Sequence, residues 1–377
     1  MNLTANNRAL WNNQSMLRSP ARPLLSGALV IAALVAGCGG SEESESPAPP
    51  PADPEAAVSG TLRTFTYSDT ASDVILDPFR KQNPDLDLKT ATFDSVQEGA
   101  AKIAGGFEAD VVNVCSDEYQ PLLTRGLLRP IDPAGIEGWD ELAFRDNEGV
   151  ERSDGLVNFV PIAAGPQGLL YNTEEVVPAP DSWADLFDPA YEGRVSIDGG
   201  TWLTPIAETA AALGAENPMV LSDEQVEEAK QKLIDSKSQF RAFTGSDSEK
   251  LNLFKGGEIV LADGGRYNAL LLQAEGEPVE WVAPKEGALS WVCGLGITSD
   301  AENIDAAYKL INYFVSEPAQ AIAGQNGFAI VNPAAVAKVP AKFRETADPR
   351  SISDAIAEVQ PDNFEAWIRA WQEVQTG

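Results

Sequence analysis

The feature that most constrains the fold is a regular alternation of short apolar runs with helical segments, beginning near residue 60. Strands are predicted over 62–67, 86–93 and 111–114, with helices over 74–81 and 96–104 between them. The alternation returns later, with strands over 194–197 and 258–262 and helices over 205–213, 223–237, 309–315 and 364–374. Strands joined through helices pair in parallel, because the connection must cross back over the sheet. The sequence therefore predicts an α/β fold.

Two segments, 157–172 and 279–297, are long, extended and poor in helix-forming residues. The folded part of the chain has about 320 residues, more than one hydrophobic core usually accommodates. We therefore expect two lobes joined by two crossover hinge segments, with a ligand in the cleft between the lobes. The expected division is 59–163 with 291–335 for lobe 1, and 164–290 with 336–377 for lobe 2.

The N-terminus has the residue order of an export signal. Arg18 and Arg22 precede an uncharged apolar run over 24–36, which is shorter than the ~20 residues that span a bilayer. Cys38 follows an Ala-Gly pair and resembles the lipobox cysteine of bacterial lipoproteins, which is acylated after cleavage. We expect residues 1–37 to be removed and Cys38 to carry a lipid. An ordinary signal peptide with an incidental cysteine is the alternative.

Residues 38–58 are dominated by Ser, Glu, Pro, Ala and Gly and contain no aromatic residue. Such a segment buries too little apolar surface to offset its ordering entropy, so we expect a disordered tether that its prolines keep extended. A lipid, a tether and a folded body together predict an exported protein anchored at the periplasmic or extracellular face of a membrane.

Charge and composition exclude several classes of function. The chain has 27 Lys and Arg against 57 Asp and Glu, so we expect no nucleic-acid partner, which would need a basic face. It contains no histidine, which excludes Ser-His and Cys-His nucleophile pairs and histidine-based metal sites. We therefore expect no enzyme, no cofactor and no metal. A hydrolase with paired carboxylates and an adhesive lipoprotein remain as other classes.

Five segments carry recognisable motifs: 126–132 (GLLRPID), 161–172 (PIAAGPQGLLYN), 181–195 (DSWADLFDPAYEGRV), 284–291 (PKEGALSW) and 327–333 (GFAIVNP). Together they resemble the spermidine/putrescine-binding family of periplasmic solute-binding proteins. The resemblance implies a type II periplasmic-binding-protein fold. It also implies a monomer that captures a small solute for the permease of an ABC importer, with ATP hydrolysis on separate chains.

In this family the ammonium groups of a polyamine pair with carboxylates, and its methylenes lie against aromatic rings. The resemblance places Tyr67, Trp291 and Phe328 at aromatic positions and Cys115 at a serine position. The family's acids are less well matched, because Cys293 stands at one of them. The family's carboxylate pair aligns with Gly199 and Trp202.

Nearby acids are candidates to compensate for these losses. The predicted ligand-binding residues are Tyr67, Asp69, Cys115, Ser116, Asp117, Asp198, Trp202, Asp263, Trp291 and Phe328. Unpaired ammonium groups in a closed cleft are costly, so the altered acids leave a second solute class open. That class is an amino acid, organic acid or phosphonate-like compound whose anionic end Arg266 would bind.

Structural alternatives exist for several candidates. Trp291 and Phe328 are equally compatible with a buried core, and Asp198 and Asp263 with helix caps.

The two remaining cysteines carry a further alternative. The resemblance places Cys115 and Cys293 at the inner ends of strands in one lobe. Either a disulfide or two small buried thiols is compatible with these positions. A bridged pair would leave neither sulfur as a free ligand contact.

Overall fold

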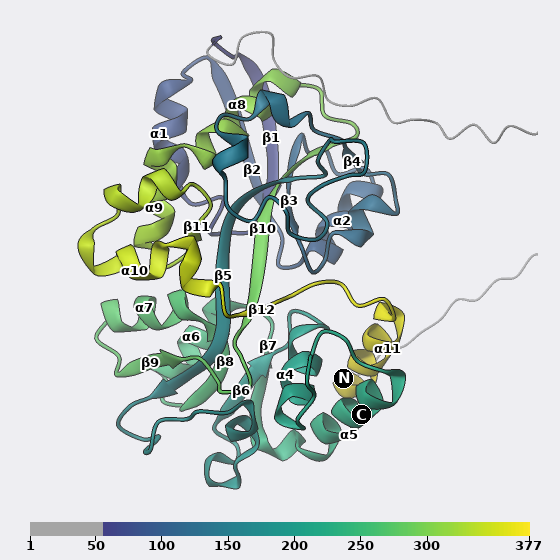
Figure 1. Cartoon of the computed structure of the whole chain (residues 1–377), viewed down its shortest axis with the longest axis vertical. Coiled ribbons are helices and arrows are strands. Elements are labelled where there is room, and N and C mark those ends of the chain that lie inside the picture. Colours follow the sequence, from purple (N-terminus) through teal and green to yellow (C-terminus); the bar gives the residue numbers. More distant parts are fainter. Residues whose placement is uncertain (1–55) are drawn as a thin grey trace, which may run out of the picture. The chain divides into compact units, whose positions relative to one another are not determined.

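The computed structural model describes residues 56–377, which lie within one compact unit, Glu45–Gly377 (Figure 1). The signal, Cys38 and most of the tether lie outside the described residues. Within the described part, the strands form a continuous sheet of order β2-β1-β3-β10-β5-β8-β6-β7, with β9 and β11 paired to β5 and β4 and β12 paired to β10. The strands are β1 (Gly60–Thr66), β2 (Leu86–Thr92), β3 (Val111–Cys115), β4 (Leu128–Arg129), β5 (Val160–Asn172), β6 (Val195–Asp198), β7 (Phe240–Thr244), β8 (Leu261–Gly265), β9 (Val279–Val282), β10 (Leu289–Thr298), β11 (Ala329–Ile330) and β12 (Ile356–Ala357).

The sheet consists of two parallel halves joined by two antiparallel strands. β1 pairs in parallel with β2 and β3, and β6 pairs in parallel with β7 and β8. β10 runs antiparallel to β3, β5 runs antiparallel to β8, and β5 and β10 pair with each other side by side (Figure 1). The predicted parallel pairing is confirmed in both halves.

The first predicted crossover is confirmed as the 13-residue strand β5. The second predicted crossover, 279–297, is longer than the strand that the structure forms there. Residues 279–297 form two strands, β9 and β10, separated by a turn over 283–288. Gly287 has φ +110 in this turn, a conformation that side chains of other residues disfavour. The chain therefore reverses before the crossover begins, and β10 alone carries it.

The predicted helices over 74–81, 96–104, 205–213, 223–237, 309–315 and 364–374 are present, and the fold adds α3, α6, α7, α9 and α10. The helices are α1 (Asp73–Gln82), α2 (Val96–Ala104), α3 (Gln120–Leu123), α4 (Thr204–Ala212), α5 (Asp223–Asp235), α6 (Asp247–Lys255), α7 (Arg266–Ala274), α8 (Ile304–Val315), α9 (Glu317–Gln325), α10 (Arg344–Ala347) and α11 (Phe364–Thr376). Serine side chains cap several of them, as Ser95 does by accepting a hydrogen bond from the Glu98 N–H of α2.

Each half-sheet has its own hydrophobic core. Leu62 of β1 packs with Phe79 of α1 and residues of α8 in one cluster. Ile197 of β6 packs with α4, α5 and Trp367 of α11 in another. Separate cores on either side of the β5–β10 pair confirm the expected two-lobe α/β architecture. Within residues 56–377, no helix combines the length and the hydropathy needed to cross a membrane.

The segment 181–195 contains a short 3-10 helix, Trp183–Phe187, which contacts the turn before β10. Ser182 accepts a hydrogen bond from the Ala184 N–H at 3.2 Å, so the predicted N-cap is confirmed. Trp183 is fully buried, and its indole N–H donates to the Gly287 carbonyl at 3.0 Å. The motif therefore holds the start of the second crossover in place.

Candidate functional site

The carboxyl ends of the parallel strands carry most of the predicted site. Asp69 lies three residues beyond β1, Asp117 two residues beyond β3, and Asp198 is the last residue of β6. In parallel sheets, ligands bind outside these strand ends. Glu358, which follows β12, hydrogen-bonds to Ser116 after β3 in one half and to Thr204 at the start of α4 in the other.

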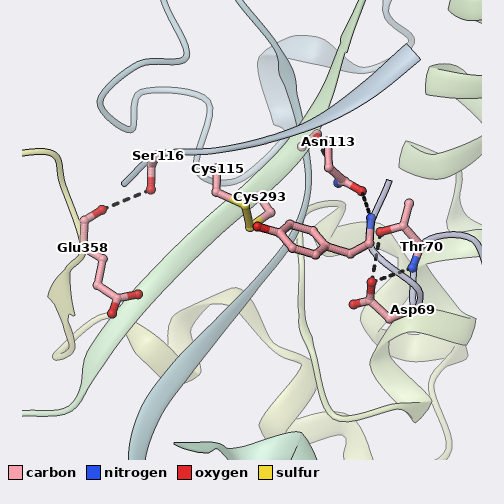
Figure 2. Close-up of a disulfide and its surroundings, with 9 residues drawn as sticks. Asp69, Thr70, Asn113, Cys115, Ser116, Cys293 and Glu358 are labelled. Atoms are coloured by element: carbon pink, nitrogen blue, oxygen red, sulfur yellow. Dashed lines mark hydrogen bonds between the residues drawn. A yellow bond between two sulfur atoms is a disulfide. The ribbon is translucent and has the colours of Figure 1, made fainter. Parts of the chain in front are cut away.

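A disulfide links two of the strands at this place. Cys115, the last residue of β3, lies directly opposite Cys293 of β10, and their sulfurs are bonded with Cα atoms 4.0 Å apart (Figure 2). Neither cysteine is therefore a free thiol. Ser116 follows Cys115, and its hydroxyl donates to the backbone carbonyl of Glu358 at 3.1 Å. The disulfide thus anchors the turn that carries Asp117 to the crossover strand.

Glu358 forms hydrogen bonds with three different segments around the site. Its backbone N–H donates to the Ser290 carbonyl of β10 at 2.7 Å, and its carbonyl accepts from Ser116. Its carboxyl Oε1 lies within hydrogen-bond distance, 3.2 Å, of the hydroxyl oxygen of Thr204 at the start of α4. Glu358 is only 2% exposed, and the charges of Asp117 and Glu118 after β3 and of Asp198 at the end of β6 act on its carboxyl group.

Asp117, Glu118, Asp198 and Glu358 form a group that we call the carboxylate cluster. Asp117, Glu118 and Glu358 are buried and Asp198 is half-buried. In the described part of the chain, Oδ1 of Asp117 has no hydrogen-bond partner. Within residues 56–377, none of the four forms a salt bridge. Such a group is unfavourable when fully ionised, because burial and like charges both disfavour carboxylates.

Burial is the main cause of the raised pKa values in this cluster. It raises the pKa of Asp117 to about 6, and it raises that of Glu118 to about 8 with a contribution from the charges of Asp117 and Asp198. Burial also raises the pKa of Asp198 to about 6, although the nearby Lys250 opposes the shift. The pKa of Glu358 lies well above its ordinary value, through burial and then the charge of Asp117. The ligand-free cluster therefore holds protons near neutral pH.

Lys250 forms a salt bridge with a carboxylate outside the cluster, that of Asp263. Its ammonium lies 2.9 Å from Oδ1 of Asp263, and both side chains are buried. The other oxygen of Asp263 accepts the Asp198 backbone N–H at 2.7 Å. Both Asp263 oxygens are thus engaged within the protein, and they orient the end of β6. Glu208 of α4 lies near this pair and is fully buried, and neither of its carboxyl oxygens has a hydrogen-bond partner among the residues that the structure describes.

Aromatic side chains gather beside the second crossover. Trp291 of β10 is half-buried, and its ring centroid lies 5.8 Å from that of Phe328. Phe328 in turn lies 5.0 Å from Tyr267 of α7, whose hydroxyl donates to Asp247. Gly165 of β5 permits this arrangement, because a Cβ there would lie 2.6 Å from the Trp291 ring.

The remaining predicted residues lie in different surroundings. Tyr67 is half-buried, and its backbone N–H donates to the Asn113 side chain at 3.0 Å. Asp69 is exposed and accepts the Thr70 N–H at 2.6 Å. Trp202 is 7% exposed and packs edge-on against Trp367 in the second core.

Arg266 is engaged by another part of the chain. Its guanidinium donates to the Thr346 carbonyl at 2.7 Å and to the Ser351 hydroxyl at 3.1 Å. These contacts connect α7 to the segment around α10.

Sequence reasoning missed Glu118, Glu358, Glu208 and Lys250. Glu118 had a weak signal, because it directly follows Asp117 at the end of a predicted strand. Glu358 had none, since only the folded chain brings the segment after β12 to the ends of β3 and β6. Within the described residues, no three acidic or cysteine side chains are arranged to hold a metal ion.

Comparison with known proteins decides the family. The family model described as "Bacterial extracellular solute-binding protein" matches residues 113–357, from β3 through both crossovers. The chain belongs to this family. It is a solute-binding protein that captures a small solute for an importer's permease, and the family is one of transport proteins and not of enzymes.

Relatives of this solute-binding protein agree with the assignment. The putrescine-binding periplasmic protein PotF of Escherichia coli is 26% identical over 347 residues, covering 85% of this chain and 93% of its own. The spermidine/putrescine-binding periplasmic protein 1 of Haemophilus influenzae is 23% identical over 270 residues, covering 70% and 72%. A structure titled as a spermidine/putrescine ABC transporter of Listeria monocytogenes superposes with a TM-score of 0.72 at 22% identity, covering 84% of this chain and 99% of that one. The last likeness confirms the fold.

The disulfide should contribute to the stability of this solute-binding protein. Replacing both Cys115 and Cys293 by Ser should lower the free energy of unfolding by about 2–4 kcal/mol, because the unfolded chain regains the freedom of a long closed loop. Urea unfolding measures this. A reductant should destabilise the unaltered protein similarly and leave the double variant unchanged; equal stability of both proteins without reductant would contradict the bond.

Glu118 should make stability depend on pH. Its pKa is about 8 in the fold against an ordinary 4.5, so its stabilising contribution is complete below about pH 4.5 and is lost as the pH rises through 8. Glu118→Gln, which cannot ionise, should raise the free energy of unfolding of the ligand-free protein by about 1–3 kcal/mol at pH 8.5. It should change little at pH 4.5.

The control is Glu228→Gln, at an exposed position in the middle of α5, which should leave the free energy of unfolding unchanged at both pH values. Urea unfolding at pH 4.5 and 8.5 measures the difference. An equal effect of Glu118→Gln at both pH values would show that Glu118 does not change its protonation there.

Proposed function

We propose that this solute-binding protein binds a polyamine, and that it is held at the outer face of the membrane by a lipid on Cys38. The main support for a polyamine ligand is the carboxylate cluster of Asp117, Glu118, Asp198 and Glu358. This cluster is mostly buried and has no salt bridge within the described residues. Ammonium groups would supply the missing positive charge, through charge-assisted hydrogen bonds.

The aromatic side chains favour a cation with an apolar stem. Trp291 and Phe328, with Tyr67 and Asp69 near the end of β1, would receive methylenes and a second ammonium group. Ser116 and the disulfide of Cys115 would position Asp117, and Asp263 would position Asp198. Trp202 would support α4 from the core.

The mode of action follows from the crossovers. Lobe 1 (59–163 and 291–335) would close on lobe 2 (164–290 and 336–377) about β5 and β10, and the closed monomer would dock on the permease. The names of the relatives, two of which are polyamine-binding proteins, support this ligand class. The second candidate, a solute with an anionic end held by Arg266, is less well supported, because that guanidinium is engaged by Thr346 and Ser351.

A thermal-shift screen of residues 59–377 tests the ligand. Putrescine or spermidine should raise the melting temperature, because a ligand of the folded state stabilises it by mass action. Trp291→Ala should weaken binding by at least ~1 kcal/mol if the ring stacks on the ligand. A shift only with amino acids, organic acids or phosphonates would exclude the polyamine, and unchanged affinity of a folded Trp291→Ala protein would make Trp291 a core residue.

Fractionation of cells tests the lipid anchor. Cys38→Ser removes the thiol that would be acylated, so the full-length protein should move from the membrane to the soluble fraction. Membrane association that persists in this variant would contradict the anchor.

A further inference from the structure

A row of oxygen atoms joins two members of the carboxylate cluster. Oδ2 of Asp198 lies 3.3 Å from the Thr201 hydroxyl, which lies 3.1 Å from the Thr204 hydroxyl. The Thr204 hydroxyl lies 3.2 Å from Oε1 of Glu358. Three oxygen–oxygen hydrogen bonds therefore connect the carboxyl group at the end of β6 to the one that follows β12.

The number of protons in this row is informative. Each of the three hydrogen bonds needs one proton between its two oxygens, and each threonine hydroxyl has one to donate. Two ionised carboxylates supply none, so one contact would be left as two facing lone pairs. The row is complete only when one of the two carboxyl groups, at Asp198 or Glu358, is protonated.

The surroundings of the two carboxyl groups decide which one holds the proton. Oδ1 of Asp198 accepts the Gly200 N–H at 2.8 Å, and Lys250 lies near enough to lower its pKa. Both contacts favour the ionised form of Asp198. Glu358 is more deeply buried, and within the described residues the Thr204 hydroxyl is the one hydrogen-bond partner of its carboxyl group.

The charged groups that face Glu358 are almost all acidic. Asp117 and Glu118 face it from the turn after β3, Asp198 from β6 and Glu208 from α4. The lysine near Asp198, Lys250 of α6, is bound to Asp263 of β8. The row therefore runs from the Glu358 O–H to Thr204, from Thr204 to Thr201, and from Thr201 to ionised Asp198.

We propose that Glu358 is a ligand-binding residue that shares one proton with Asp198 through Thr204 and Thr201, and that it gives up this proton when a cationic solute binds. The ligand part of this inference rests on the proposed function. On binding, an ammonium group of the solute replaces the proton as the positive charge beside Glu358. The Glu358 O–H bond breaks, the proton passes to solvent, and the carboxylate accepts an N–H from the solute. Affinity for a diamine should therefore rise with pH.

The first experiment needs no ligand. Carbon-13 NMR of the protein labelled at the glutamate carboxyl carbons, with Glu358→Gln to assign the resonance, reports the protonation of Glu358 directly. The Glu358 carboxyl should be in its acid form at pH 7. A Glu358 carboxyl that is ionised at pH 7 would overturn the shared proton.

The second experiment measures protons released on binding. Titration calorimetry with putrescine at pH 7, in two buffers of different ionisation enthalpy, should show that Glu358→Gln releases about one proton fewer than the unaltered protein and binds at least tenfold more weakly. The glutamine amide can still donate to Thr204, so the row and the fold should be retained. Glu228→Gln, at an exposed position of α5, should match the unaltered protein in both measurements.

The outcomes separate the two proposals. Tight binding of putrescine with no change in Glu358→Gln would overturn the role of Glu358 in the site. An acid-form Glu358 in a protein that binds no polyamine would support the shared proton and contradict the proposed function instead.

Discussion

The antiparallel pairing of β5 with β10 is the contact on which the rest of the structure depends. One parallel half pairs with β10 through β3, and the other pairs with β5 through β8. The pairing of β5 with β10 therefore joins the two halves into one sheet. Gly294 shows how closely the two strands approach, because a Cβ there would lie 2.2 Å from the Val160 carbonyl oxygen. The parallel strands end beside this pair, and their polar side chains converge there.

Convergence of strand ends explains the electrostatics of the site. Asp117, Glu118 and Asp198 come from two different half-sheets, and Glu358 enters from the C-terminal segment. Burial alone makes each carboxylate unfavourable, and mutual proximity increases the cost. The fold tolerates this arrangement by retaining protons and by hydroxyl groups such as those of Thr201 and Thr204. Under the proposed function, such a site would exchange protons for a cationic ligand without large changes in local charge.

Much of the fold was accessible from sequence because it depends on local pattern. The predicted helix over 96–104 coincides with α2, and the N-cap at Ser182 follows from its short side chain before Trp183. The prediction over 279–297 was less accurate, because extended segments look alike whether they form one strand or two strands around a turn. The aspartates of the site were found as acids that could compensate for the altered acid positions of the family. Glu358 was not, because nothing in its neighbours along the chain distinguishes it from a surface glutamate.

The sequence by itself determined the class of the protein: an α/β chain with two crossovers, an acidic composition without histidine, and motifs of a solute-binding family. These depend on the order and type of residues, which local propensity and hydrophobic periodicity express directly. Only the tertiary structure decided that Cys115 and Cys293 are bonded, that Arg266 is engaged by the segment around α10, and that Glu358 joins the carboxylate cluster. Each of these involves residues tens to hundreds of positions apart, and their proximity follows from strand register and packing, which no local pattern contains.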